Sequence, residues 1–477
     1  MKRFTKAMFF VALCLSITQM HAQEATQEIN QQLDQLLENN KISQEDGSWK
    51  ITSAAVSSIS GIQHVYYRQV VNGLEVHGTE SGIHLLPNGK VLSEDNKFIA
   101  HAAERALGGN QPSITAIQAV QAAAQQLGYN ITDGISVIER SQELDQQSLL
   151  SDGGISKSPI PAKLIYTLND NNELVLVWDL SIEENAGLNW WNARVDASSG
   201  QIVNKTNWMV SCSFEHDHST HEEMTDYNLN LVDMPNYNAA ALEEDAGCTE
   251  CYEVIALPFE SPFFGDRTIE VNSADPIASP FGWHDTNGVA GAEFTTTRGN
   301  NVNAYEDGDN PGYQPDAGSD LDFIGYPFSE FYSNTDQFED AAITNLFYWN
   351  NVTHDLLFFY GLDEASGNFQ ETNYSGVGNG SDSVNAEAQD GSGTCNANFG
   401  TPPDGANPRM QMFVCGNRDG DYDNLVIVHE YGHGVSNRLT GGPNNTGCLG
   451  NTEQMGEGWS DYPVSYTHLT LPTTPYV

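Results

Sequence analysis

Basic residues are scarce in this chain of 477 residues. It has 19 Lys and Arg against 64 Asp and Glu, so its formal net charge is −45 with histidine neutral. Nucleic acids and anionic membrane surfaces are bound through basic patches, and the sequence shows none, which argues against both kinds of partner. An acidic surface keeps a protein soluble at high salt and offers oxygen ligands to divalent cations.

Long apolar runs are also few. The run at residues 7–17 follows three basic residues and precedes a small residue, Ala22, where a signal peptidase could cleave. It is shorter than the roughly 20 residues of a spanning helix, which makes a membrane anchor the weaker alternative. We therefore predict a signal peptide at residues 1–22 and a secreted, extracellular protein without a membrane span.

Cysteine is infrequent, with seven in the chain, and Cys14 falls in the predicted signal peptide. The six that remain are consistent with disulfides in an exported protein, with the pairing left open. Cys248 and Cys251 have C-x-x-C spacing, but a structural zinc site needs a second pair of ligands nearby. We therefore expect no metal or redox function for this pair.

The chain changes character near residue 210. Before it, residues 23–209 show β-rich segments such as 64–71 and an Ala- and Gln-rich helical segment at 114–127, which predicts one or two small α+β units. After it, Asp, Asn, Gly and aromatic residues dominate, and a long helix is predicted at 336–361. We expect two functionally different parts that meet close to Met209.

The strongest chemical signal is the H-E-x-x-H sequence from His429 to His433. Four residues of an α-helix correspond to about 400° of rotation, so both histidines lie on one face, about 6 Å apart along the axis. Two imidazoles in this arrangement can bind one Zn²⁺, and Glu430 lies close enough to act on water there. The five-residue pattern also occurs by chance, so it requires a third ligand.

Glu457 is the candidate third ligand. It follows His433 by 24 residues, which leaves room for a loop and the start of a second helix. Catalytic zinc takes three protein ligands, and two histidines with one glutamate are one such set. Asp461 lies four residues further on the same helical face, where it could accept a ring N–H from a zinc ligand and hold that histidine in one tautomer.

The chain resembles the gluzincin metallopeptidases, whose prototype is thermolysin, in the motifs His429-Glu430-x-x-His433 and Glu457-x-x-Ser460-Asp461. The longer match is to the fungalysin family. The matching stretches are GWHDTNG (282–288), TTTRGNNVNAYED (295–307), AAITNLFYWNNVTHDLL (341–357), NAEAQDGSGTCNANF (385–399), VIVHEYGHGVSNRLTGGP (426–443) and MGEGWSD (455–461). Upstream, HVYYRQVVNGLEVHGTESGIHLLPNGKV resembles the fungalysin/thermolysin propeptide module. Residues of about 113–207 look like the PepSY-type half of such a prosegment.

The resemblance implies an α+β fold and the precursor of a secreted zinc endopeptidase that cleaves proteins and peptides. It divides the chain into a signal peptide (1–22), a propeptide that acts as an intramolecular inhibitor (23–209) and a catalytic domain (210–462). The β-rich half of a thermolysin-like domain and its active-site helix are expected to follow the prosegment.

The resemblance also assigns roles to individual residues. His429, His433 and Glu457 would bind zinc, Glu430 would be the general base, and Asp461 would orient His429. Asn396 and Ala397 would lie on the edge strand that aligns the substrate backbone, with Asn398 and Phe399 as the alternative alignment.

The family pattern breaks off at Tyr462. The family continues into a helical lobe that forms the other wall of the cleft, whereas residues 463–477 contain no charged residue and resemble the in-frame translation of a transposase adapter. We expect a non-native tail at 463–477, a missing C-terminal lobe, and a truncated, inactive chain.

Two further expectations stay open. The acid-rich loops, including Asp404, Asp419 and the run at 306–309, suit structural Ca²⁺, although none has EF-hand spacing. The alternative function is a non-catalytic binding or inhibitory protein built on the propeptide domains, with a degenerate peptidase module. An intact H-E-x-x-H sequence with Glu457 favours the enzyme.

Overall fold

The computed structural model describes residues 43–185, 187–211, 249–329, 337–449 and 455–469, with a helical stretch between residues 29 and 39. The predicted signal peptide, Cys212, Cys248 and the end of the predicted tail lie outside the described residues. The chain combines mostly antiparallel sheets with a smaller number of helices, which is consistent with the predicted α+β class. In the described part, every helix is too short or too polar to cross a bilayer.

The first unit is an antiparallel sheet. Its strand order is β1-β2-β4-β5, with β3 paired to β2. The side chains of β2 alternate between buried and half-buried, so Val65, Tyr67 and Val71 face inward. Its elements are η1 (Gln44–Gly47), β1 (Trp49–Val56), β2 (Gln63–Val71), β3 (Leu74–Glu75), β4 (Ser81–Leu85), β5 (Val91–Asp95) and α2 (Ala102–Arg105).

The second unit is a six-stranded antiparallel sheet covered by one helix, α3 (Ala116–Leu127). Ala119, Val120 and Ala123 of α3 are buried in one core with Trp178 and Val195 of the sheet. The strands are β6 (Val137–Arg140), β7 (Ser148–Leu150), β8 (Ile160–Leu168), β9 (Leu174–Glu183), β10 (Trp190–Asp196) and β11 (Ile202–Asn207).

The start of α3 differs from the predicted one at Ile114. Thr115 is the N-cap, because its hydroxyl accepts the Gln118 N–H while the Gln118 side chain accepts the Thr115 N–H. This reciprocal capping box satisfies two donors that would otherwise lack partners, which a cap at Ser113 would not achieve.

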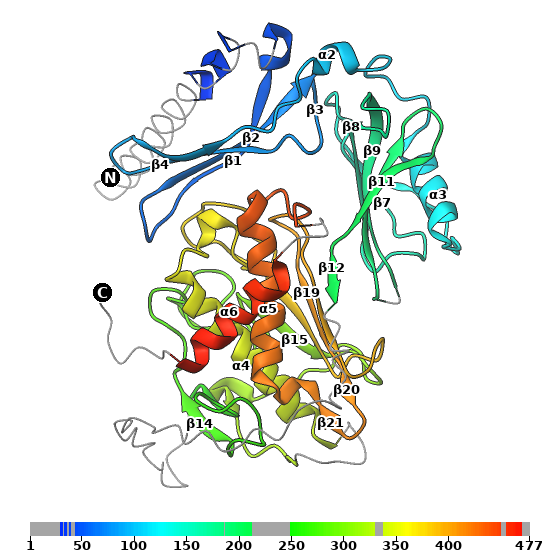
Figure 1. Cartoon of the computed structure of the whole chain (residues 1–477). Helices are drawn as coiled ribbons and strands as arrows, with labels where there is room; N and C mark the ends of the chain where they lie inside the picture. The colour runs from blue at the N-terminus through cyan, green and yellow to red at the C-terminus, as the bar shows by residue number, and fades with distance from the viewer. Residues whose placement is uncertain are drawn as a thin grey trace, which may run out of the picture.

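The third unit contains a mixed sheet of order β12-β18-β19-β17-β15 and two long helices, α4 and α5. Its edge strand β12 spans the predicted boundary between prosegment and catalytic domain at Met209, and Figure 1 shows β12 running from the second unit into the third. The sheet and helices are β12 (Met209–Ser211), β15 (Val302–Glu306), β17 (Val384–Ala388), β18 (Ala397–Gly400), β19 (Arg409–Met412), α4 (Glu339–Phe358), α5 (Asn424–Gly441) and α6 (Gly456–Leu469).

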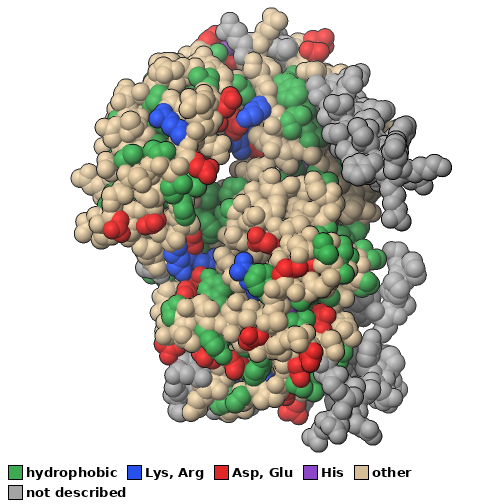
Figure 2. Space-filling model, turned by 180° about the vertical axis from the view of Figure 1, so that it is seen from behind, with side chains coloured by type: hydrophobic (Ala, Val, Ile, Leu, Met, Phe, Trp, Pro, Cys, Tyr) green, Lys and Arg blue, Asp and Glu red, His purple; other side chains and the backbone are tan. Residues whose placement is uncertain are grey.

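Short elements complete this unit. They are β13 (Cys251–Val254), β14 (Thr268–Val271), η3 (Gly318–Asp320), β16 (Asp322–Phe323), η5 (Glu364–Ser366), β20 (Val414–Cys415), β21 (Arg418–Asp419) and η6 (Gly420–Tyr422). The helix predicted at 336–361 is confirmed as α4, which packs with α5 over one apolar core. Figure 2 shows acidic side chains spread over the visible face, with few basic ones among them.

Arg438 anchors the last turn of α5 inside this unit. Its guanidinium is fully buried, and Nη1 lies 3.0 Å from Asp382 Oδ2 and 3.3 Å from Asp404 Oδ1. The same group donates to the carbonyl oxygens of Gly367 and Pro402, each at 3.0 Å. One side chain therefore ties α5 to two loops.

We expect Arg438→Met to lower the free energy of unfolding by about 3–5 kcal/mol, because it leaves two buried carboxylates without their cation. Urea unfolding followed by intrinsic fluorescence measures the change. Lys90→Met, in an exposed turn, is the control and should shift stability by less than about 0.5 kcal/mol. Equal stability of the two variants would contradict the anchoring role.

Candidate metal centre

Helix α5 presents its two histidines from a rigid support. Asp423 caps its first turn by accepting the Val426 N–H, and Ile427 and Tyr431 are buried in the apolar core. His429 and His433 lie on the same face, with ring centroids 4.8 Å apart and ring planes at 82°. The predicted helical arrangement of this motif is therefore what the structure contains.

Glu457 reaches these histidines from α6. Its Oε2 lies 3.2 Å from His429 Nε2 and 3.6 Å from His433 Nε2. Ligands about 2.1 Å from a tetrahedral ion are roughly 3.4 Å apart, so these three side chains fit a single zinc ion. One ligand atom from each lies within 4.8 Å of the others, which makes this one of two such clusters among the described residues.

The approach of α6 depends on Gly432. A Cβ at this position would lie 2.9 Å from Ser460 Cα and 3.0 Å from its hydroxyl. Any larger side chain would push α6 away and withdraw Glu457 from the histidines. The sequence reasoning assigned no role to Gly432, although its place inside the H-E-x-x-H motif was a signal of close packing.

The outer nitrogens of both rings are held by α6. His429 Nδ1 lies 2.9 Å from Asp461 Oδ1, and His433 Nδ1 lies 3.2 Å from Ser460 Oγ. Each Nε2 is thereby turned toward Glu457. The structure places Asp461 where the sequence analysis expected it, while the contact of Ser460 went unnoticed because serine is a weak signal for a metal site.

Burial also prepares the site for a cation. It lowers the pKa of His433 to about 3, with a smaller contribution from His429, so the imidazole is neutral and keeps a lone pair for a metal. Glu430, on the next helical position after His429, is fully buried. The arrangement thus combines two imidazoles and a carboxylate with a second carboxylate, Glu430, beside them.

The strand β18 lies against α5 and carries the predicted substrate-binding residues. Ala397 begins β18 and Asn396 immediately precedes it. On one side β18 pairs with β19, and on the other side Met209, Val210 and Ser211 of β12 pair antiparallel with Gly400, Phe399 and Asn398. The chain at the predicted prosegment boundary therefore occupies the edge of the predicted substrate strand.

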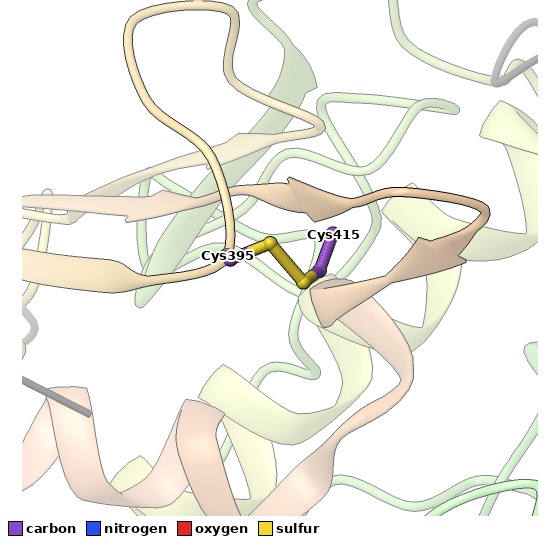
Figure 3. The surroundings of a disulfide bond; sticks show 2 residues. All are labelled: Cys395 and Cys415. Atoms are coloured by element: carbon purple, nitrogen blue, oxygen red, sulfur yellow. A yellow bond between two sulfur atoms is a disulfide. The ribbon is translucent and has the colours of Figure 1, made fainter. Parts of the chain in front are cut away.

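A disulfide holds the start of this strand. Cys395 is bonded to Cys415 of β20, with Cα atoms 4.2 Å apart, as Figure 3 shows. Because Cys395 directly precedes Asn396, the bond restrains the predicted substrate residues. Cys251 is also disulfide-bonded.

The acids proposed for calcium have partners within the protein. Asp404 contacts Arg438, Asp423 caps α5, and Glu306 accepts the N–H groups of Gly308, Asp309 and Asn310. Calcium in those loops stays a prediction.

Comparisons with known proteins agree with this geometry. Residues 251–474 match the family model described as Fungalysin metallopeptidase (M36), and residues 47–98 match the Fungalysin/Thermolysin Propeptide Motif. These matches confirm the predicted resemblance, and the first extends beyond Tyr462.

Curated relatives are similar along most of the chain. "Extracellular metalloproteinase MEP" of Leptosphaeria maculans is 33% identical over 436 residues, which cover 89% of this chain and 62% of that protein. "Extracellular metalloproteinase 5" of Arthroderma otae is 34% identical over 416 residues, with coverages of 85% and 58%. "Extracellular metalloproteinase mep" of Aspergillus fumigatus is 32% identical over 447 residues, with coverages of 89% and 62%. The chain spans 58–62% of the length of these relatives.

Asp461→Asn and Ser460→Ala are each expected to weaken zinc binding by about 10–100-fold, because each removes the partner that orients a histidine ring. Competition with a fluorescent zinc chelator measures the affinity. Asp133→Asn, an exposed carboxylate in the first half of the chain, is the control and should bind zinc like the parent. Parent-like affinity in both site variants would show that α6 does not orient the histidines.

Proposed function

We propose, from the premise that this chain belongs to the fungalysin metallopeptidases, that it is the precursor of a secreted zinc-dependent endopeptidase. The observation that carries the proposal is the convergence of His429, His433 and Glu457, whose facing atoms have the spacing of ligands to one ion. Secretion rests on the signal peptide predicted at 1–22 and on relatives that are named extracellular metalloproteinases.

The residues of this chain divide the chemistry among them. His429, His433 and Glu457 would hold zinc, and Asp461 and Ser460 would fix the orientation of the two imidazole rings through their Nδ1 atoms. Zinc, when bound, supplies Lewis acidity that activates water and polarises a peptide carbonyl. The carboxylate of Glu430 takes a proton from the attacking water and later delivers it to the leaving amine.

Substrate binding is proposed along the edge of β18. An extended peptide would add to this strand by backbone hydrogen bonds, the recognition mode in which a sheet edge selects its ligand. Asn396 and Ala397 lie at the end of β18 toward which the antiparallel register of β12 leads. Asn398 and Phe399, which already face β12, keep the alternative alignment open.

The prosegment is proposed to block this edge. β12 pairs with β18 in the manner expected of a peptide substrate, so a substrate and the chain at the predicted end of the prosegment, Met209–Ser211, compete for the same backbone groups. Ser58 adds a second contact, since its N–H donates to Asp363 Oδ2 at 2.8 Å. Activity is therefore expected only after β12 has left.

We expect about one zinc per chain, and its loss in a His429→Ala/His433→Ala double variant, as measured by elemental analysis after dialysis. Zinc content is the primary measurement because it does not depend on the position of the prosegment. His101→Ala, at an exposed histidine, is the control. A metal-free parent chain would instead favour the alternative, a non-catalytic binding protein.

Glu430→Gln is expected to keep the zinc. In protein whose prosegment has been removed, it should lower any hydrolysis of a fluorogenic peptide by about 10²–10⁴-fold, because the amide cannot accept the proton. Hydrolysis that survives this change would contradict the general-base role.

Gly400→Ala is expected to loosen the prosegment. Its Cβ would lie 2.5 Å from Met209 Sδ and 3.1 Å from the ring of Trp190, so it acts as a wedge on the prosegment side of β18. Binding of a fluorescent peptide hydroxamate, a zinc-directed probe, should tighten several-fold. Gly47→Ala has open space around its Cβ and is the control, and equal affinity of both variants would argue against a block by β12.

A further inference from the structure

A second group of carboxylates gathers where the parallel strands β15 and β17 end. Asp307 directly follows β15, Glu387 is in β17, and Asp390 follows β17 by two residues. The parallel pairing of β15 and β17 brings them together, so that one oxygen of each lies within 4.8 Å of the others. Neither the H-E-x-x-H motif nor the proposed peptide hydrolysis uses this group, which we name the acidic triad.

A cation from the prosegment already lies in the acidic triad. Lys157 Nζ is 3.2 Å from Asp307 Oδ2 and 3.2 Å from Glu387 Oε1. Lys157 precedes β8, so its ammonium crosses from the second unit to the third. The position of this ammonium is an independent sign that the triad attracts a positive ion.

Glu387 is the buried member of the triad. It is 2% exposed, Tyr305 donates its hydroxyl to Oε1 at 3.1 Å, and Oε2 has no hydrogen-bond partner among the described residues. The nearest cation to Oε2 is Arg409 Nε at 3.9 Å.

The other partners leave room for a metal. Asp390 accepts the Ser392 N–H on Oδ1 and the Gln411 amide on Oδ2, both at 2.7 Å, and Oδ1 also accepts the Ser392 hydroxyl. These bonds orient the carboxylate and leave a lone pair on Oδ2. Arg409 is held by Glu183 of the second unit, Nη1 to Oε1, at 2.9 Å.

Charge counting favours a divalent ion. Three carboxylates and Arg409 sum to −2 once Lys157 and Glu183 are gone, and one divalent cation neutralises this sum. An ammonium ion in the same place supplies only half of that charge.

We propose that the acidic triad is a binding site for a divalent cation of the calcium type, and that Lys157 fills it in the precursor. Carboxylate oxygens are the ligands that Ca²⁺ prefers, and its flexible coordination suits a site completed by water. The site becomes accessible when the prosegment leaves, a step that rests on the proposed function, whereas the site itself does not. Removal of the prosegment would thus exchange an internal cation for a free one.

The test uses the full chain and calcium alone. In metal-depleted buffer, isothermal titration with CaCl₂ should show that Lys157→Met binds one additional Ca²⁺, or binds Ca²⁺ at least tenfold more tightly, than the parent chain. Lys163→Met is the matched control, because Lys163 also pairs with a carboxylate, Glu75, but lies outside the triad. It should titrate like the parent.

A second substitution assigns the gain to the triad. Glu387→Gln added to Lys157→Met should abolish the additional binding, and Lys157→Gln should reproduce the gain if the methionine variant folds poorly. Identical titrations of the parent and both Lys157 variants, or a gain that survives Glu387→Gln, would overturn the proposal. Zinc content, measured in the same samples, reports separately on the proposed peptidase site.

Discussion

The position of α5 depends on one buried charge, the guanidinium of Arg438. It neutralises Asp382 and Asp404 and satisfies two carbonyl groups, so the last turn of the helix is held by loops from both sides. A buried cation of this kind tolerates little displacement, because each partner would lose a hydrogen bond that water cannot replace. His433 and His429 lie one to two turns earlier on the same helix, so they are held in place by the same anchor.

The metal centre is completed by packing rather than by the motif itself. Gly432 lets α6 approach α5 to within van der Waals distance, and Glu457, Ser460 and Asp461 then reach both rings. The same helix thus supplies a ligand and the two groups that orient the other ligands. Asp461 is largely exposed, but it belongs to the same packed helix as Glu457, and this fixes its position beside His429.

The two halves of the chain are joined through the catalytic sheet at two separate points. At one edge β12 extends the sheet beside β18, and near the other side Lys157 and Glu183 meet Glu387 and Arg409 in alternating charges. The first contact uses backbone hydrogen bonds, which any extended peptide could form. The second uses side-chain charges, which respond to ions and to salt. The chain has a net charge of −45, yet its few basic side chains lie opposite particular carboxylates and compensate their charge locally.

The sequence by itself determined the helical spacing of His429 and His433, the candidate ligand Glu457 and the partner Asp461. These depend on local periodicity and on ligand chemistry, which are readable along the chain. It also indicated the change of character near Met209, because composition shifts there. The start of α3 was missed, since Ser113 is also a residue type that caps helices, although only Thr115 has a glutamine three residues later to complete a reciprocal cap.

Only the tertiary structure decided how distant segments meet. The pairing of β12 with β18, the contact of Ser460 with His433, and the acidic triad around Lys157 join residues separated by 27 to more than 200 positions. No local pattern specifies such contacts, because they arise when sheets and helices pack and must satisfy their buried polar groups. From the sequence alone, acidic residues are interpreted as a solvated surface. Only the fold shows which of them face a cation.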